Sequence, residues 1–306
     1  MTLNIHPLPS PEGRADGQPR PLQAGATRPF QSWHYAMLND QQRNQAIRDA
    51  IEELDLDGRT VVEIGAGTGI ISILFARAGA RRVIACEMNQ AMAKVAMETI
   101  RRAGLGERIT ILPLSSTMAL DQGILPNEPD VIFTETVDCG VIGEGYHAIA
   151  RDIRRMAGEN TIVLPNEIRQ YGVIISSAAI HGLNHVEDVF GIDMAPLNAW
   201  STRTYFPVRA EYHGFEMLSR PRLVRTYDYL EDIPAAPVSM QITNPGTAHG
   251  LLTWFELRMG NHATTNAPGT NSHWHQAFHP LPRPLELKKG EVISLHLDDQ
   301  GMVNLG

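Results

Sequence analysis

Short apolar runs alternate with helix-like segments between residues 60 and 165, and this alternation restricts the fold more than any other feature. Short apolar segments are typical of buried strands, whereas the longer segments between them have the spacing of amphipathic helices. The expected strands are 60–65, 81–87, 108–114, 129–135 and 161–165, and the expected helices are 69–79, 90–104 and 146–157. Strands and helices in this order predict a parallel, doubly wound α/β sheet.

The pattern changes after Pro165. Strand-like segments such as "GLLTWFELRM" and "EVISLHL" are separated there by Pro, Gly and Asn, which predicts an antiparallel β domain, either a sandwich or a barrel. We therefore expect an α/β domain over residues 30–163, beginning with one or two amphipathic helices, and a β domain over 164–306. Residues 1–29 contain six prolines and three glycines and are expected to form a disordered tail.

The composition argues against several classes of protein. A net charge of −8 over 306 residues argues against a general nucleic-acid binder, which needs a basic face. No apolar run approaches the roughly 20 residues that span a bilayer, and the first residues lack the layout of a signal peptide. Cys86 and Cys139 are the only cysteines, too few for a disulfide framework. We therefore expect a cytoplasmic protein that binds neither nucleic acid nor membranes.

A glycine-rich turn follows the first expected strand. "VVEIGAGTGI" places Gly65, Gly67 and Gly69 where the backbone can approach a ligand closely. Glu87 ends the second expected strand, where an acid can accept both hydroxyls of a ribose. The spacing differs from that of dinucleotide folds, and together these features favour a nucleoside cofactor over a bare turn. Glu63 could bind the loop or pair at the edge of the sheet.

Two glutamates, Glu135 and Glu144, lie nine residues apart in the loop "FTETVDCGVIGEGYH". The loop contains no Lys or Arg to neutralise them, and Asp138 adds a third acid between them. A solvated loop could carry these charges, so their meaning depends on what the chain builds around them.

Five segments of the sequence carry a resemblance to a known family. The segment "VVEIGAGTGIISILFARAGARRVIACE" resembles the first two motifs of class I S-adenosylmethionine-dependent methyltransferases. Four others are similar to segments of the arginine methyltransferases: "WHYAMLNDQQRNQAI", "TETVDCGVIGEG", "HVEDVFGIDMAPL" and "NSHWHQAFHPLPRPLELKKGE", with Ser272 in place of a threonine. The match runs over about residues 30–297 in the family's order. It implies a Rossmann-like S-adenosylmethionine-binding domain followed by an antiparallel β-barrel domain.

The resemblance also implies which residues bind the cofactor. Arg43 matches an arginine that pairs with the methionine carboxylate, a task that suits a bidentate guanidinium, and Glu87 matches the acid on the ribose. The remaining expected cofactor residues are Met37, Glu63, Gly65, Gly67, Gly69 and Thr117. Family members often carry a glutamate that contacts the adenine amine after the third strand, but "LSSTMAL" offers only Ser116, Thr117 and Met118 there.

The resemblance implies a chemical role for the two loop glutamates. Glu135 and Glu144 match the family's glutamate pair, and two carboxylates can hold one planar guanidinium with a nitrogen facing the methyl donor. Without substrate, their repulsion is expected to raise the pKa of one glutamate. Asp138 could bind an unmethylated guanidinium or cap a turn, and Tyr146 is expected on the substrate side.

His273 and Trp274 match the family's loop that packs against this pair. His273 could orient a glutamate or accept a proton. "HWHQAFH" could also bind a metal through His273 and His275, but no acid or cysteine nearby in sequence completes a ligand set. Cys139 lacks an obvious histidine partner for nucleophilic catalysis. We expect neither a metal nor a covalent intermediate.

The resemblance predicts an arginine guanidino N-methyltransferase. Its acceptor could be free L-arginine or another small guanidine in a biosynthetic pathway, or arginine in a protein, and the lack of an added recruitment module favours the small molecule. Asp138, followed by Cys139 and Gly140, resembles the monomethylating branch, so one methyl group is expected. Two other classes, a non-catalytic scaffold that binds S-adenosylmethionine and a nicotinamide oxidoreductase, are disfavoured by the complete site and by the glycine spacing.

The family also assembles through an arm in the β domain, which implies a homodimer here. The matching arm lies near residues 196–215. Its aromatic residues Trp200, Tyr205 and Phe206 could form the interface or belong to the core of the β domain.

Overall fold

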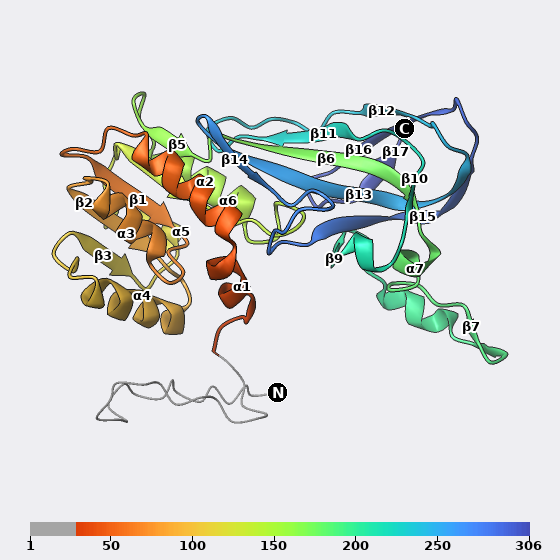
Figure 1. Ribbon diagram of the computed structural model, residues 1–306, viewed down its shortest axis with the longest axis horizontal. Coiled ribbons are helices and arrows are strands. Elements are labelled where there is room, and N and C mark those ends of the chain that lie inside the picture. The colour runs from red at the N-terminus through yellow and green to blue at the C-terminus, as the bar shows by residue number, and fades with distance from the viewer. Residues whose placement is uncertain (1–28) are drawn as a thin grey trace.

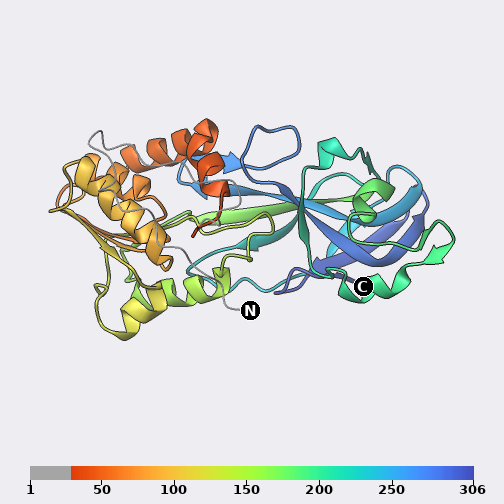
Figure 2. The same ribbon diagram turned by 90° about the horizontal axis from the view of Figure 1, so that it is seen from below.

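The computed structural model describes residues 29–306, and its two halves lie end to end (Figure 1). A parallel sheet with its helices forms one end, and antiparallel strands form the other. Helices α1 (Trp33–Asn39) and α2 (Gln41–Glu52) lie near the junction, where α2 contacts both halves (Figure 2). The predicted disordered tail, 1–29, lies outside the described residues apart from Pro29.

The parallel sheet has five strands in the order β3-β2-β1-β4-β5. These are β1 (Thr60–Ile64), β2 (Arg82–Cys86), β3 (Ile109–Leu112), β4 (Val131–Thr134) and β5 (Ile162–Leu164). The chain changes direction across the sheet at β1, between β2 and β4, and ligands bind beyond the carboxyl ends of the strands at such a switch point. The predicted doubly wound sheet is confirmed.

Helices cover both faces of this sheet. They are α3 (Ile70–Arg77), α4 (Gln90–Arg102), α5 (Ser116–Asp121) and α6 (Tyr146–Met156). One apolar core joins α2, α3 and α4 to one face, and a second joins α5 and α6 to the other face. This second core continues into the β domain through Phe255 and Trp274, so the two halves share buried contacts. Three of the helices were expected, whereas α5 was not.

The second half contains two antiparallel sheets around a common apolar core. The first sheet contains β6 (Glu167–Ser176), β9 (Phe206–Val208), β10 (Glu216–Met217), β11 (Arg222–Tyr227), β13 (Gly246–Met259), β14 (His262–Thr265) and β15 (Gln276–Leu287). The second contains β12 (Val238–Gln241), β16 (Val292–Leu297) and β17 (Val303–Leu305). Because side chains from both sheets fill one interior, the domain is barrel-like, and the predicted antiparallel domain is confirmed.

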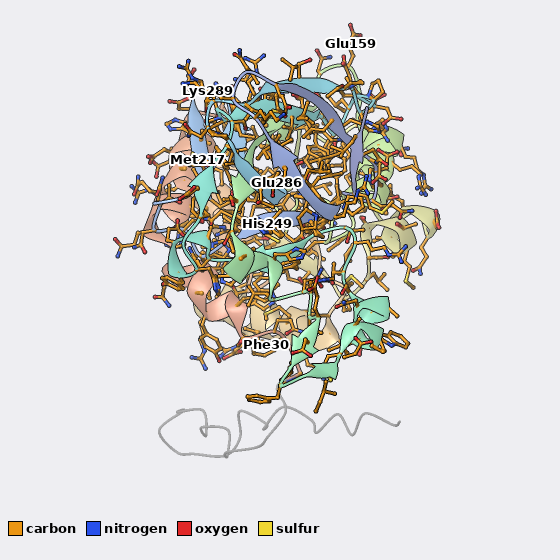
Figure 3. All side chains as sticks on the ribbon, turned by 90° about the vertical axis from the view of Figure 1, so that its right-hand side faces the viewer. Phe30, Glu159, Met217, His249, Glu286 and Lys289 are labelled. Atoms are coloured by element: carbon orange, nitrogen blue, oxygen red, sulfur yellow. The ribbon has the colours of Figure 1, made fainter. Side chains whose placement is uncertain are left out.

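An arm projects from the far end of the β domain (Figures 1 and 3). It comprises α7 (Ala178–His181), β7 (Asp188–Val189), β8 (Ile192–Asp193) and a 3-10 helix, Ala195–Trp200. Trp200 is 88% exposed. Tyr205 and Phe206, in contrast, are half-buried and pack on His279 and Phe278. The exposed arm therefore ends near Trp200, earlier than the predicted segment 196–215.

The change from parallel to antiparallel pairing occurs between Leu164 and Glu167. The division of the chain into domains remains a prediction, and these sheets favour a boundary just after Leu164 over one at 163/164. Within residues 29–306, no helix has the length and apolar character required to cross a membrane.

Candidate active site

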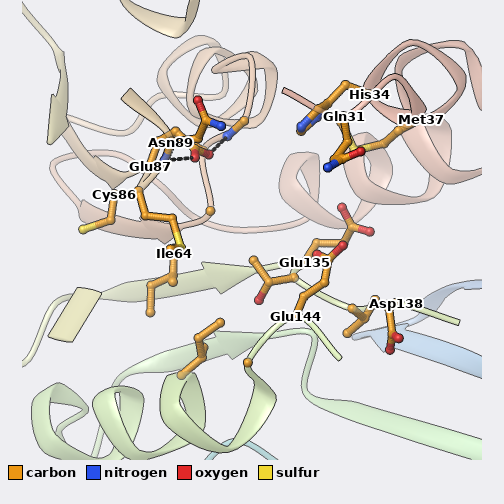
Figure 4. A pocket seen from close by; sticks show the side chains of 18 of the residues that line it. Gln31, His34, Met37, Ile64, Cys86, Glu87, Asn89, Glu135, Asp138 and Glu144 are labelled. Carbon is orange, nitrogen blue, oxygen red and sulfur yellow. Dashed lines mark hydrogen bonds between the residues drawn. The ribbon is translucent and has the colours of Figure 1, made fainter. Parts of the chain in front are cut away.

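A cavity of about 880 Å³ lies beyond the carboxyl ends of β1, β2 and β4, within the usual range for small-ligand sites. Residues from α1, the glycine turn, α6 and the β domain complete its wall. Glu135 and Glu144 lie on one side of it, across from His34 and Met37 (Figure 4). The switch point of the sheet thus coincides with the loop that carries both glutamates.

The glycine turn brings the first strand and helix close to this loop. Gly65 has a φ of 82°, and a Cβ there would overlap the side chain of Thr136, the residue after Glu135. Gly67 has a φ of 53° and open space where a Cβ would lie, whereas Gly69 is the N-cap of α3. The turn therefore needs glycine both for its backbone conformation and for the close approach of the loop.

Glu63 lies in the central strand β1 and is almost fully buried. It accepts a hydrogen bond from Oγ of Ser72 on α3. Burial raises the pKa of its carboxyl to about 8, although the hydrogen bond from Ser72 opposes the rise. Because β1 is flanked by β2 and β4, the predicted alternative of pairing at the edge of the sheet is wrong. Glu63 instead joins the strand to the helix that follows the glycine turn.

Glu87 directly follows β2 and lines the cavity, and main-chain donors hold its carboxylate. Oε2 accepts from the Gly67 amide and Oε1 from the Asn89 amide, both at 2.8 Å (Figure 4). Burial raises the pKa of Glu87, and the two amide hydrogen bonds oppose that shift. Each carboxylate oxygen keeps acceptor capacity for a further donor.

Arg43 contacts the first loop glutamate. Nη2 of its buried guanidinium forms an ion pair with Oε2 of Glu135. Arg43 lies 6.0 Å above the ring of Trp274 and also lines the cavity. The structure thus brings two predicted site residues, from α2 and from the end of β4, into direct contact.

Glu144 has no hydrogen-bond or ion-pair partner among residues 29–306. Its side chain reaches solvent through the open cavity, but protein atoms surround it on its other sides. This burial, followed by repulsion from Glu135 and Asp138, raises its pKa to about 7. The predicted rise in pKa is therefore found at Glu144, because Arg43 already neutralises Glu135.

Asp138 forms hydrogen bonds within the loop of residues 135–144, here called the clamp loop. Oδ1 accepts from the amides of Gly140 at 3.1 Å and Gly143 at 3.0 Å, and Oδ2 accepts from the Tyr205 hydroxyl at 2.9 Å. Burial raises the pKa of Asp138, and these three bonds oppose the rise. Of the two predicted roles, these contacts fit the turn cap.

His273 is held by Asp40, a residue that the sequence did not single out. Nδ1 of the ring and the His273 amide both lie 2.9 Å from Oδ2 of Asp40, and Oδ1 of Asp40 accepts from the Arg43 amide. Since a carboxylate can only accept, Nδ1 carries the proton and Nε2 keeps its lone pair. Burial is the largest effect on the ring and lowers its pKa. Asp40 therefore links the two elements that carry Arg43 and His273.

Trp274 lies beside the clamp loop, whereas Tyr146 does not reach the cavity. The indole Nε1 donates to the Val137 carbonyl at 3.0 Å, which ties the β domain to the clamp loop. Tyr146 is 6% exposed, donates its hydroxyl to the Asp228 carbonyl and packs on Tyr227. Its expected place on the substrate side is not what the structure shows, because its position at the start of α6 turns it into the apolar core.

The end of the cavity lined by Ser116 and Thr117 carries an acid from α6. Thr117 and Ser116 both donate to Oδ2 of Asp152, at 2.6 and 2.7 Å. Asp152 lies on α6, is 2% exposed and lines the cavity. An acid is thus present at this end, but it comes from a helix rather than from the segment after the third strand.

Several buried polar atoms on the cavity wall have no hydrogen-bond partner among the described residues. They are Nδ1 of His34, Nε of Arg43 and Oγ1 of Thr68. Buried polar groups are nearly always satisfied in folded proteins, so these atoms fit a polar ligand. His34 was missed from the sequence, although it lies three residues before Met37, one helical turn away on α1 and also in the wall.

Other catalytic classes find little support in the described part of the chain. No group of three or more His, Cys, Asp or Glu within residues 29–306 could hold a metal ion. Cys139 is buried, and burial strongly raises the pKa of its thiol, whereas a nucleophilic cysteine needs a lowered pKa.

Comparison with protein families gives two matches along the chain. Residues 173–301 match the arginine methyltransferase oligomerization subdomain. Residues 46–138 match the ribosomal protein L11 methyltransferase family. The first match covers most of the antiparallel half, and the second covers the glycine turn and the start of the clamp loop.

Individual proteins show the same similarity. An arginine N(omega)-methyltransferase of Streptomyces achromogenes subsp. streptozoticus is 36% identical over 278 residues, which is 89% of this chain and 77% of the relative. Protein arginine N-methyltransferase 9 of Xenopus laevis is 29% identical over 83% of this chain, which spans only 35% of that relative's length.

The fold matches a solved structure of the PRMT1 enzyme-prozyme complex of Trypanosoma brucei with AdoHcy. The TM-score is 0.72 with 21% identity, and the match covers 86% of each chain. The similarity to the Streptomyces relative covers 89% of the chain and therefore extends over both of its halves. The chain therefore belongs to the arginine N-methyltransferase family of S-adenosylmethionine-dependent enzymes.

Proposed function

We propose that the protein transfers one methyl group to the guanidino group of free L-arginine or of another small guanidine. The observation that carries this proposal is the unequal glutamate pair: Glu135 is neutralised by Arg43, whereas Glu144 faces the same cavity with no cationic partner among residues 29–306. A guanidinium is planar, permanently charged and has five N–H donors, so it can supply the missing charge and bind carboxylates.

The cavity wall fits S-adenosylmethionine beside this pair. Arg43 can use its unpartnered Nε toward the methionine carboxylate while its Nη2 holds Glu135. Glu87 can accept the ribose hydroxyls with its remaining lone pairs. Met37, Glu63, Gly65, Gly67, Gly69 and Thr117 complete the proposed cofactor site. When bound, the cofactor supplies an electrophilic methyl group on a sulfonium.

The chain's own residues then position the acceptor and receive its proton. Glu135 and Glu144 hold the guanidinium so that one nitrogen faces the cofactor, and this positioning supplies much of the rate. Trp274 supports the clamp loop through the Val137 carbonyl. Because burial lowers the pKa of His273, its ring is neutral. Its Nε2 can then accept a proton while Nδ1–H stays hydrogen-bonded to Asp40.

The relatives favour a free amino acid as acceptor. The Streptomyces relative is named for arginine itself and aligns over most of its own length. Relatives named for protein arginine have lower identity, 29% or less, and carry much additional chain outside the match. Protein arginine is the second candidate, because the same clamp can bind an arginine side chain in either setting.

The proposal of a single methyl group rests on the resemblance of the clamp loop to the monomethylating branch. Asp138 is occupied by hydrogen bonds within the loop and to Tyr205. The space beside Gly140 is filled by the Tyr205 ring rather than by the cavity. Asp138 and Gly140 are thus both committed to contacts with Tyr205 rather than to the acceptor.

One experiment tests the activity, the acceptor and the product. The protein is incubated with labelled S-adenosylmethionine and free L-arginine in one reaction, and with an Arg-Gly-rich peptide in another. We expect label in free arginine and, by mass spectrometry, the gain of one methyl group. Label only in the peptide contradicts the proposed acceptor, and a dominant gain of two methyl groups on one guanidine contradicts monomethylation. No label in either reaction contradicts the activity.

We also propose a homodimer with the arm in its interface. The arm exposes a group of apolar side chains, Leu183, Val189, Phe190, Ile192, Leu197 and Trp200, and apolar surfaces of this kind mark interaction sites. Light scattering at micromolar concentration should give the dimer mass for the native protein. Trp200→Ser and Phe190→Ser should shift that mass toward the monomer, whereas Val292→Ser, on the exposed side of β16, should not. A monomeric native protein contradicts the proposal.

A further inference from the structure

Tyr205 fits a slot between the clamp loop and the end of the β domain. A Cβ on Gly140, in the clamp loop, would overlap Cε2 of the Tyr205 ring. A Cβ on Gly301, just before β17, would lie 2.7 Å from its Cδ1. Protein interiors are close-packed, so both positions must lack a side chain for the ring to enter. Two glycines from distant parts of the chain thus form the walls around one tyrosine.

The hydroxyl of Tyr205 reaches the backbone next to Glu144 through Asp138. It donates to Oδ2 of Asp138 at 2.9 Å, while Oδ1 accepts from the Gly140 and Gly143 amides. Gly143 immediately precedes Glu144, the glutamate that has no cation partner among the described residues. The Asp138 side chain, itself held by Tyr205, therefore fixes the backbone conformation in the second half of the clamp loop.

The other side of the Tyr205 ring rests on a fixed part of the β domain. Its centroid lies 5.3 Å from that of His279. His279 is fully buried, with Nδ1 2.7 Å from the Gly301 carbonyl and Nε2 2.8 Å from Oγ1 of Thr253. Because both ring nitrogens of His279 are engaged, the surface beneath Tyr205 is rigid.

Tyr205 also lies just beyond the point where the arm returns to the β domain. Asn184, which lies in the arm just after α7, donates to the Thr202 carbonyl and accepts from the Thr202 amide, both at 2.8 Å. Ser201 Oγ donates to the Asn184 carbonyl at 2.6 Å. These bonds close the base of the arm three residues before Tyr205. A change in how the arm is held can therefore be transmitted to the ring.

We propose that Tyr205 is a positioning residue that couples the arm to the clamp loop through Asp138. When the arm is docked, the base held by Asn184 keeps Tyr205 in its slot, and Asp138 keeps Glu144 directed into the cavity. The inference rests on the proposed role of Glu144 as half of the guanidinium clamp. Its chemistry is positional, since Tyr205 itself does not line the cavity.

Two variants distinguish the contribution of the Tyr205 hydroxyl from that of its ring. Tyr205→Phe keeps the ring in its slot and removes only the bond to Asp138, whereas Tyr205→Ala removes both. We expect Tyr205→Phe to lower kcat about tenfold with S-adenosylmethionine affinity unchanged by calorimetry, and Tyr205→Ala to lower it further. In an Asp138→Ala background, Tyr205→Phe should change kcat less than twofold, because its partner is already absent. Tyr212→Phe, at a tyrosine that is 83% exposed, is the matched control and should behave like the native protein.

Hydrogen exchange tests the coupling to the arm without relying on activity. In Tyr205→Phe, the amides of Gly140 and Gly143 should exchange at least threefold faster than in the native protein. Trp200→Ser should produce the same change from a distance, and combining it with Tyr205→Phe should add little. Native exchange in the clamp loop of both Tyr205→Phe and Trp200→Ser overturns the coupling.

The outcomes also distinguish this inference from the proposed function. If the native protein methylates arginine and Tyr205→Phe keeps native kcat, the positioning role is wrong and the proposed function stands. If no guanidine is methylated but the clamp loop still loosens in Tyr205→Phe and Trp200→Ser, the coupling stands and the proposed function is wrong. Equal loss of S-adenosylmethionine affinity and kcat in Tyr205→Phe would indicate general loosening and overturn a specific role at Glu144.

Discussion

The carboxylates at the two ends of the cavity differ in their hydrogen-bond partners. At the proposed cofactor end, each oxygen of Glu87 accepts a main-chain N–H, from Gly67 or Asn89, at 2.8 Å. At the proposed guanidinium end, Glu144 has no donor among residues 29–306. Burial raises the pKa of both, but hydrogen bonds oppose the shift only at Glu87, whereas other acids add to it at Glu144.

This difference shows which part of the site is preorganised. The backbone around Glu87 is fixed by the glycine turn and by the start of α4, so this carboxylate is in place before any ligand binds. Glu144 is held in position by the clamp loop but lacks a counter-charge, and a bound cation would relieve the repulsion from Glu135. We therefore expect changes at Glu144 to affect the acceptor and changes at Glu87 to affect the cofactor.

The largest expected effect is the loss of turnover in Glu144→Gln and Glu135→Gln. Each change keeps the size of the side chain but removes one charge from the clamp, and a hydrogen bond to a charged group contributes about 1.5–3 kcal/mol. With one or two such bonds weakened, kcat/KM for the guanidine should fall about a hundredfold, while calorimetry should give nearly native S-adenosylmethionine affinity.

Glu52→Gln, at an exposed position on α2, is the matched control for these two variants. Near-native turnover in either clamp variant would contradict the clamp. An equally large loss of cofactor affinity in Glu144→Gln would contradict the division between the two ends.

A smaller effect is expected at the other end from Glu87→Ala. This change removes the proposed acceptor of the ribose hydroxyls and leaves the amides of Gly67 and Asn89 without their partner. The Kd for S-adenosylmethionine should rise about tenfold to a hundredfold, from one or two lost charged hydrogen bonds, with the fold intact by circular dichroism. Unchanged cofactor affinity would remove Glu87 from the ribose site.

The sequence predicted the parallel sheet well because its signal is local. Each of β1 to β5 is a short apolar run, and each falls within its expected range. Helix α5 was missed because its six residues are too short to show helical periodicity. The arm was placed too late in the chain because aromatic content does not distinguish the exposed Trp200 from Tyr205, which is packed on His279.

Within the site, residues that belong to a motif were predictable, and residues defined by long-range contacts were not. Sequence reasoning predicted that one glutamate of the pair would have a raised pKa, but identifying Glu144 required the ion pair between Arg43 and Glu135. Asp40 lies 233 positions before His273, so only the fold reveals their contact. Asp152 was also missed, because nothing local indicates that α6 turns this acid toward Ser116 and the cavity.

The smallest expected effect, about a twofold fall in kcat/KM at pH 7 relative to high pH, concerns the charge of Glu144. Its pKa in the unliganded site is raised from the ordinary 4.5 to about 7, and only the deprotonated form can pair with a guanidinium. Activity should therefore be full well above pH 7 and fall as the pH is lowered through 7. His273 titrates lower, because burial lowers its pKa. Initial rates with both substrates far below their KM report the free enzyme, and the residual activity of Glu144→Gln should lack this limb. A native midpoint near pH 4.5 would mean that the cavity solvates Glu144 fully and that the two ends of the cavity do not differ in the way described.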